Sequence, residues 1–337
     1  MNKSTLNKFI DYLQKTYVIH APVRDGKELY VKEIDEKSEI DYSNQIPINT
    51  YKSVLLPSRE TLFDFKKGKL QKPKMDYTPE CAFLMSISDL KAVSLFNQTF
   101  RHDPYYQKKR QSTLLIGQAF FEGSGFCGHV RDYYEEDILE HINFDIILIK
   151  AGKSSWKLFT GSEKGQIILD KFKVRDYDHI EFVGPIKEEG LDPMLEKHRI
   201  QIVEASQAVW DEWGAKCTAC GKCAVDCPTC YCYNIDDEQD TKEKGSGQRV
   251  RSWTTCFYND FSEVGGGNKF LKENSARIQN WYTHKWVRTP HEFSIMGCVN
   301  CGRCDKVCPV GIKRADVFKS LEENKLPKFK NKAKKNK

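Results

Sequence analysis

Cysteines are the residues of this sequence whose type and spacing point most directly to chemistry. Residues 217–232, CTACGKCAVDCPTCYC, hold six of the thirteen cysteines in the chain. Within this stretch, residues 217–228 follow the pattern C-x2-C-G-x-C-x3-C-P, and residues 298–309 repeat it with Gly302 in the place of Gly221. Thiolates at such density are typical of metal ligands when a chain lacks a secretory signal. The sequence therefore presents two matched ligand sets.

The spacing is that of bacterial ferredoxins, in which the fourth cysteine of each run binds the other cluster. Three closely spaced thiolates can face one cubane from a tight loop, while the fourth lies beyond the loop that the proline ends. This predicts two [4Fe–4S] clusters with crossed ligands. The first would be bound by Cys217, Cys220, Cys223 and Cys308, and the second by Cys298, Cys301, Cys304 and Cys227. Zinc is the alternative metal, but two runs of four that end in proline fit clusters better. Clusters that only stabilise the fold are the alternative role.

Three cysteines of the same region remain outside these two sets. They are Cys230, Cys232 and Cys256. They raise the hypothesis of a third centre, which would need a fourth ligand because a cubane has four. The candidates for this ligand are Cys127, Cys81, His284 and Asp260. The alternative is that the three are small buried residues, since free cysteine is often buried.

The rest of the sequence divides around this cysteine-rich part. Residues 1–205 interleave strand-like and helical segments, which predicts an α/β domain. The expected strands are 17–23, 53–58, 81–87, 113–120 and 144–150, and the expected helices are 1–17, 88–100 and 133–142. Residues 206–322 would form a mainly helical, ferredoxin-like domain with a long insert between the two runs. Residues 323–337 would be a basic flexible tail.

Three segments near or within the second domain carry further expectations. Residues 194–213 have the pattern of one continuous helix, and the polar residues 236–249 read as an exposed loop. A further helix would carry Trp281, Tyr282, Lys285 and Trp286, and its aromatic positions have a spacing more typical of a protein core than of a cofactor site.

Composition excludes some classes of function. The net charge of +6 comes partly from the lysine-rich tail, and no nucleic-acid reader motif accompanies it. No apolar run is long enough to span a membrane, and the N-terminus lacks a signal-peptide core. These features predict a cytoplasmic protein that does not bind nucleic acid.

Several motifs taken together resemble a known family. They are the run at 217–232, RSWTTC, GGGNKF, GCVNCGRCDKVCPVGI, LLPSRETLFDF, SISDLKAV and FTGSEKG. In this order they resemble the iron–sulfur beta subunits of sulfhydrogenase-type NiFe hydrogenases, and equally the A subunit of anaerobic sulfite reductase. The family also carries cysteines at the positions of Cys230, Cys232 and Cys256.

The resemblance implies a non-catalytic subunit that carries electrons in an anaerobic oxidoreductase complex. It would relay electrons between a flavin-containing, NAD(P)H- or ferredoxin-linked subunit and a catalytic hydrogenase or sulfite-reductase subunit. The alternative is a redox enzyme with its own flavin or substrate site in the first domain, for which Cys127 with His129 and His141 with Asp145 are the only grouped candidates. Two departures from the family pattern fall in that domain: the stretch around Cys127 keeps only the cysteine, and Ser88 stands where the family has cysteine.

Overall fold

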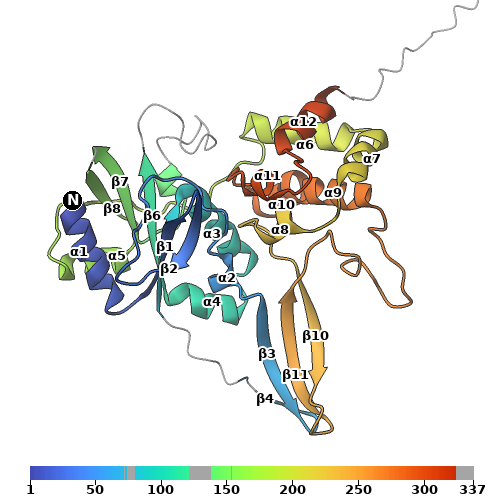
Figure 1. The fold of residues 1–337 in the computed structure, drawn as a ribbon, viewed down its shortest axis with the longest axis horizontal. Helices are drawn as coiled ribbons and strands as arrows, with labels where there is room; N and C mark the ends of the chain where they lie inside the picture. The colour runs from blue at the N-terminus through green and yellow to red at the C-terminus, as the bar shows by residue number, and fades with distance from the viewer. Residues whose placement is uncertain (72, 74–79, 121–137, 153, 324–337) are drawn as a thin grey trace, which may run out of the picture.

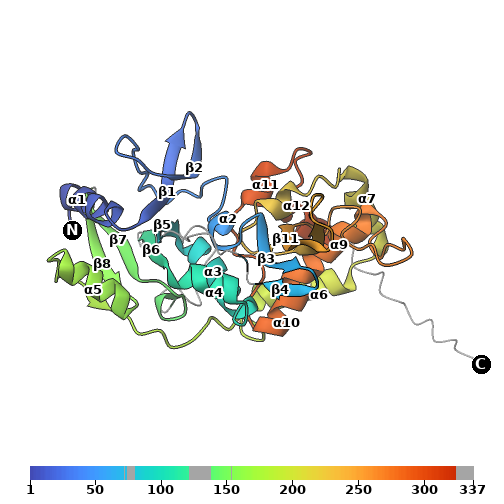
Figure 2. The same ribbon diagram turned by 90° about the horizontal axis from the view of Figure 1, so that it is seen from below.

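A computed structural model of the chain describes residues 1–71, 73, 80–120, 138–152 and 154–323. Figure 1 shows an α/β part that contains the N-terminus and a helical part that contains the cysteine runs, with a narrow antiparallel sheet projecting from the junction between them. Figure 2, turned by 90°, shows the same two parts side by side. None of the helices in these described ranges is long and apolar enough to cross a membrane.

The N-terminal part is built on a seven-stranded sheet of order β2-β1-β5-β6-β7-β8-β9. Strands β1, β5, β6 and β7 are mutually parallel. Strand β2 pairs antiparallel with β1, and β8 pairs antiparallel with β7 but parallel with β9. The strands are β1 (Val18–Asp25), β2 (Glu28–Glu33), β5 (Cys81–Ser86), β6 (Thr113–Phe120), β7 (Ile146–Gly152), β8 (Ser155–Thr160) and β9 (Asp178–His179). Parallel strands need crossover connections, and α3 (Ile87–Thr99) and α4 (Pro104–Gln111) supply the one between β5 and β6.

Helices cover both faces of this sheet. On one face lie α1 (Lys3–Gln14) and α5 (Glu163–Lys171), and on the other lie α2 (Lys52–Leu55), α3 (Ile87–Thr99) and α4 (Pro104–Gln111). A short 3-10 helix, η2 (Ile138–Glu140), precedes β7. Successive side chains of a strand point to opposite faces, so Phe83 packs on the α3 side and Leu84 on the α1 side. This burial on both faces explains the almost wholly apolar sequences of β5, β6 and β7.

A second sheet joins two segments that lie far apart in the sequence. Its strand order is β10-β11-β3-β4, and all its pairs are antiparallel. The strands are β3 (Arg59–Lys66), β4 (Lys69–Gln71), β10 (Tyr233–Gln239) and β11 (Ser246–Trp253). The buried Arg251 of β11 binds Glu60 of β3 and Asp103 at the start of α4. This second sheet therefore connects the insert between the two cysteine runs to the N-terminal part.

The helical part packs around tryptophans. Its core contains Trp210, Trp213, Trp281 and Trp286, and several cysteines of both runs lie in it or against it. The helices are α6 (Pro193–Glu204), α7 (Gln207–Lys216), α8 (Lys222–Val225), α9 (Asn274–Thr283), the π-helix η3 (His284–Arg288), α10 (Thr289–Phe293), α11 (Arg303–Val307) and α12 (Arg314–Glu323). Asp192 caps α6 and Pro193 occupies its first turn, as helix starts favour.

A fully buried ion pair joins the two parts. The two terminal guanidinium nitrogens of Arg303 in α11, Nη1 and Nη2, donate to the carboxylate of Asp89 in the first turn of α3, at 2.7 and 3.0 Å. The exposed fractions of the two side chains are 0% and 2%. A third donor of Arg303 binds the carbonyl of Pro47 at 2.8 Å. The second cysteine run is therefore anchored directly to the N-terminal sheet domain.

The structure confirms most of the expected elements and corrects three. Residues 53–58 are not a strand, because residues 52–55 form the short helix α2. Residues 194–213 form two helices rather than one, since Ala205 adopts an extended backbone between α6 and α7. Residues 236–249 are not a loop but most of the β10–β11 hairpin, whose register is set by pairing with β3. Of the expected helix at 133–142, residues 133–137 lie outside the described residues, as does the basic tail from residue 324.

Candidate iron–sulfur centres

The two cysteine runs share a backbone conformation as well as a sequence pattern. In the first run Ala219 and Gly221 have φ values of 52° and 75°, and in the second Asn300 and Gly302 have values of 56° and 73°. Each run thus makes two left-handed residues within its first five positions, and a short helix follows at once. This tight loop turns the first three thiols of a run toward the same side, as binding to one cluster requires. Glycine is the residue expected at such positions, so Ala219 is strained.

Replacing Ala219 with glycine is expected to stabilise the protein by about 1 kcal/mol, because glycine adopts a left-handed backbone without steric cost. The matched control is Ala215→Gly, at an exposed position in the last turn of α7, which should destabilise by about 0.5–1 kcal/mol. Thermal unfolding under anaerobic conditions measures both changes. Destabilisation of similar size in both variants would contradict the strain assigned to Ala219.

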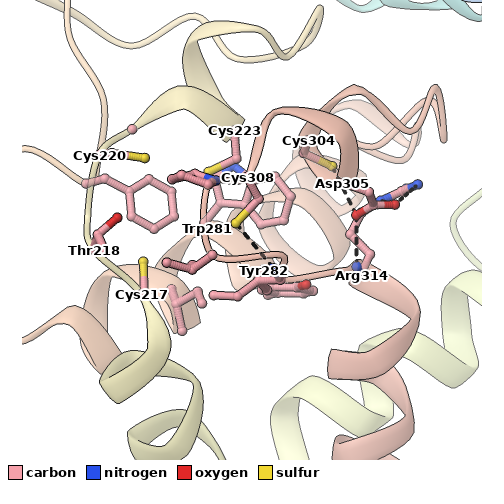
Figure 3. Close-up of a pocket in the computed structure, with 16 residues that line it drawn as sticks. Cys217, Thr218, Cys220, Cys223, Trp281, Tyr282, Cys304, Asp305, Cys308 and Arg314 are labelled. Carbon is pink, nitrogen blue, oxygen red and sulfur yellow. Dashed lines mark hydrogen bonds and ion pairs between the residues drawn. The ribbon is translucent and has the colours of Figure 1, made fainter.

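One cavity gathers cysteines from both runs. Its wall includes Cys217, Cys220, Cys223 and Cys308. Figure 3 shows these four side chains in the same pocket as Trp281 and Tyr282. Backbone amides point at two of the sulfurs: Ala219 N–H donates to Sγ of Cys217 and Ile312 N–H to Sγ of Cys308, each at 3.3 Å. The set expected for the first cluster therefore surrounds one space.

A second cavity gathers the other four. Its wall includes Cys298, Cys301, Cys304 and Cys227. The last of these comes from the first run, where it follows α8, and it crosses to the second run as the spacing predicts. Trp281, Cys304 and Arg314 line both cavities, so the two spaces share a wall.

The two cavities differ in their access to solvent. Cys220 is exposed, as is Val310 on the same wall, which opens the first cavity toward the surface. Cys227 and Cys298 of the second cavity are buried. Burial raises the pKa of the Cys223 thiol well above its usual value, and it raises the pKa of Cys301 to about 11. As free thiols these two cysteines would stay protonated, whereas metal binding deprotonates them.

Two buried lysines hold the crossing residue, Cys227. Lys52 of α2 donates to the carbonyl oxygens of Val225 at 2.6 Å and Cys227 at 3.1 Å, where α8 ends. Lys285 donates to Sγ of Cys227 at 3.2 Å. A hydrogen bond from Cys230, together with the charge of Lys285, holds the pKa of Cys227 well below its usual value.

The sequence pattern predicts a core position for the aromatic neighbours of Lys285 and no role for Lys285 itself. Trp281, Tyr282 and Trp286 are core residues, but Lys285 turns its ammonium to a sulfur. The signal that could have revealed it is a lysine in an otherwise apolar helix face. The sequence pattern also gives no indication of the contacts that Arg303 makes with Asp89 and Arg314 makes with Cys298, although each arginine lies near a ligand cysteine in the chain.

The three surplus cysteines lie close to this lysine. Burial raises the pKa of Cys256 to about 12, and the nearby groups that influence it include Cys232 and Lys285. Cys230 is hydrogen-bonded to Cys227, which raises the pKa of Cys230 well above its usual value. Of the candidates for a fourth ligand, Cys81 lies in the core of the N-terminal sheet, Asp260 is exposed and Cys127 lies outside the described residues. His284 is half-buried and packs edge-on to Tyr231.

The candidates for a separate site in the N-terminal domain are engaged in its structure or lie outside the described residues. Asp145 accepts hydrogen bonds from Leu115 N–H at 2.7 Å and from the Ser162 hydroxyl at 2.6 Å. His141 contacts the carbonyl oxygen of Gly184 through Nδ1 at 3.0 Å. Cys127 and His129 are among the residues that the structure does not describe.

The chemistry of the two cavities fits cubane clusters. Each is lined by at least the four thiols that a [4Fe–4S] cluster needs and has a largely apolar wall, and amide or cationic donors face the sulfurs. Within the described ranges, no three Cys, His, Asp or Glu side chains converge tightly enough for a single metal ion. Cubane thiolates bind separate irons at the corners of a cage, so they surround a volume rather than meet at a point.

Comparison with known proteins gives the same picture. Residues 216–312 match the family described as a 4Fe-4S dicluster domain. The chain is 24% identical to sulfhydrogenase 2 subunit beta of Pyrococcus furiosus, across 94% of this chain and 96% of that one. It is 20% identical to the F420-dependent formate dehydrogenase subunit beta of Methanocaldococcus jannaschii, over 38% of this chain and 26% of that one. No solved structure matches significantly.

The dicluster match begins one residue before the first ligand run and ends after the second, so it covers both cavities. The similarity to the sulfhydrogenase subunit covers the N-terminal sheet domain as well. The protein thus carries a 4Fe–4S dicluster domain behind an α/β domain, and its resemblance to the iron–sulfur beta subunits of hydrogenases is confirmed.

Proposed function

We propose that this protein is the electron-transfer subunit of an oxidoreductase complex and that it relays electrons through two [4Fe–4S] clusters. Cys217, Cys220, Cys223 and Cys308 would bind the first cluster, and Cys298, Cys301, Cys304 and Cys227 the second. The clusters supply one-electron redox chemistry when bound. The protein itself supplies the ligands, excludes water from the inner site and places the two sites next to each other.

The observation that carries this proposal is the wall that the two cavities share. Electrons move between redox centres without the making of bonds. A relay therefore needs two centres close to each other and one centre near the protein surface. Trp281, Cys304 and Arg314 border both cavities. The exposed Cys220 gives the first site an edge that a partner protein can approach. The second site is the more buried of the two. It lies on the side of the N-terminal domain, to which the ion pair of Arg303 with Asp89 attaches the second cysteine run.

The partners that we propose follow the resemblance. One is a flavin-containing subunit linked to NAD(P)H or ferredoxin, and the other is a catalytic subunit of the hydrogenase or sulfite-reductase type. The two relatives are both named as beta subunits, one of a sulfhydrogenase and one of a formate dehydrogenase, which supports a place in a multisubunit complex. We place this complex in the cytoplasm, where reduced thiols remain available for iron.

The relay is tested with the full chain assembled anaerobically from iron and sulfide. After reduction by dithionite and removal of the excess, the chain should pass electrons rapidly to a soluble dye. The cluster absorbance that reduction bleached should return, and the EPR signals of the reduced clusters should disappear. It should not oxidise NAD(P)H in the presence of the same dye. Bound flavin with NAD(P)H turnover would instead support a redox site of its own in the N-terminal domain.

Iron content decides the role of the three surplus cysteines. About eight irons per chain would leave Cys230, Cys232 and Cys256 as free thiols near Lys285. About twelve would assign them to a third cubane. In that case the triple serine variant should lose about four irons and keep the other two centres.

A further inference from the structure

The sulfurs of the two cavities meet different kinds of hydrogen-bond donor. Backbone amides serve Cys217 and Cys308 at the first cavity. In the described part of the chain, no lysine or arginine side chain hydrogen-bonds to a sulfur of that set. At the second cavity the donors include cations: Lys285 Nζ lies 3.2 Å from Sγ of Cys227, and Arg314 Nη1 lies 3.1 Å from Sγ of Cys298. Neutral groups are also present there, since the hydroxyl of Thr229 lies 3.2 Å from Sγ of Cys227.

The cations of the second cavity differ in how their charge is balanced. Arg303 is paired with Asp89, and Arg314 with Asp305 at 3.2 Å. Lys285 donates to Sγ of Cys227, to the hydroxyl of Thr229 at 2.9 Å and to the carbonyl of Gly297 at 3.0 Å. Among the described residues, no carboxylate forms an ion pair with it. An ammonium only 2% exposed is costly to bury unless a negative group lies beside it. The group that this arrangement offers is the thiolate of Cys227.

The surrounding backbone fixes the ammonium in this place. Lys285 belongs to the π-helix η3, an uncommon element that is frequent at functional sites. Gly297 N–H donates to the carbonyl of Lys285 at 2.8 Å, and a Cβ on Gly297 would lie 2.9 Å from Cα of Lys285. A side chain at residue 297 would therefore push the helix away from Cys227. The contact is built by three separate segments, at 227–229, 284–288 and 297.

We infer that Lys285 is a positioning and tuning residue that raises the reduction potential of the second [4Fe–4S] centre. The inference rests on the proposed function. Reduction adds one electron to the cubane and neither makes nor breaks a bond, so the cluster and its thiolates become more negative by one charge. A fixed cation that donates to a ligand sulfur stabilises this reduced state more than the oxidised state. In a buried site the effect is strong because water screens it little.

An EPR-monitored redox titration of the full, anaerobically assembled chain tests the inference, with dithionite and mediators as the electron source. The Lys285→Met variant should make one centre at least tenfold harder to reduce, which is about 59 mV for a one-electron couple. The affected signal should be the one that Cys298→Ser removes. Lys285→Arg should restore most of the potential.

The matched control is Lys222→Met. Lys222 follows Gly221 in the first run as Arg303 follows Gly302 in the second, but its side chain is exposed, so neither potential should change. If Lys285→Met does not assemble fully, Lys285→Gln, which keeps an N–H donor, is titrated instead, with the same direction of shift expected.

Unchanged potentials in a fully loaded neutral variant would overturn the inference. So would loss of the second centre in both neutral variants, because Lys285 would then serve assembly alone. A wild-type chain without two cubane signals would refute the proposed function rather than the role of Lys285.

Discussion

Replacing Cys308 with alanine is expected to abolish the cluster of residues 217–223, although Cys308 lies in the other run. The reason is that its side chain lines the cavity of Cys217, Cys220 and Cys223. About four of about eight irons should be lost, together with one EPR signal. Cys227→Ala should have the converse effect and remove the cluster of the second run.

The matched control is Cys81→Ala, which removes a buried thiol from the N-terminal sheet and should leave the iron content unchanged. If each run instead supplied all four ligands of one cluster, the losses of signal would be exchanged. In that case Cys308→Ala would remove the same signal as Cys298→Ala, and the crossed arrangement would be wrong.

Replacing Arg303 with methionine is expected to lower the free energy of unfolding by about 3–5 kcal/mol. Loss of the guanidinium leaves the carboxylate of Asp89, which is 2% exposed, without its bidentate partner. The effect should be large for a single substitution, since most changes cost about 0.5–3 kcal/mol. Denaturant unfolding followed by tryptophan fluorescence under anaerobic conditions measures it.

Two further variants separate the buried pair from other causes. Lys222→Met changes the equivalent position of the first run, which is exposed, and should have little effect on stability. The double variant Arg303→Met with Asp89→Leu should recover part of the loss, because no unpaired charge then remains buried. A double variant as unstable as the sum of both single variants would show that the ion pair itself is not the cause.

The spacing of the cysteines carried most of what the sequence could reveal about the site. It predicts two crossed sets of four cysteines. The members of each set line one cavity together, and Cys304 of the second set also borders the first cavity. Buried strands such as 81–87 and 113–120 could also be predicted, because apolar residues on both faces of a strand are typical of parallel sheets.

Features that depend on contacts between distant segments could not be predicted. The hairpin at 233–253 has a polar, charged sequence typical of a loop, and it is a sheet because β3 pairs with β11. Lys285 lies in a segment whose period indicates a core helix, and only the fold brings Cys227, 58 residues earlier in the chain, to its ammonium. Ala219 gives no local signal of its left-handed backbone beyond its place in the repeat.

The central claim is that two adjacent cubanes occupy the two cysteine-lined cavities. It is tested most directly by iron and sulfide analysis of the full chain, purified anaerobically, together with EPR spectroscopy of the dithionite-reduced protein. We expect about eight irons and eight sulfides per chain and two [4Fe–4S]⁺ signals. Because the cavities share Trp281, Cys304 and Arg314, these signals should broaden each other by magnetic coupling. A chain that holds about four irons, or zinc in place of iron, would contradict the account.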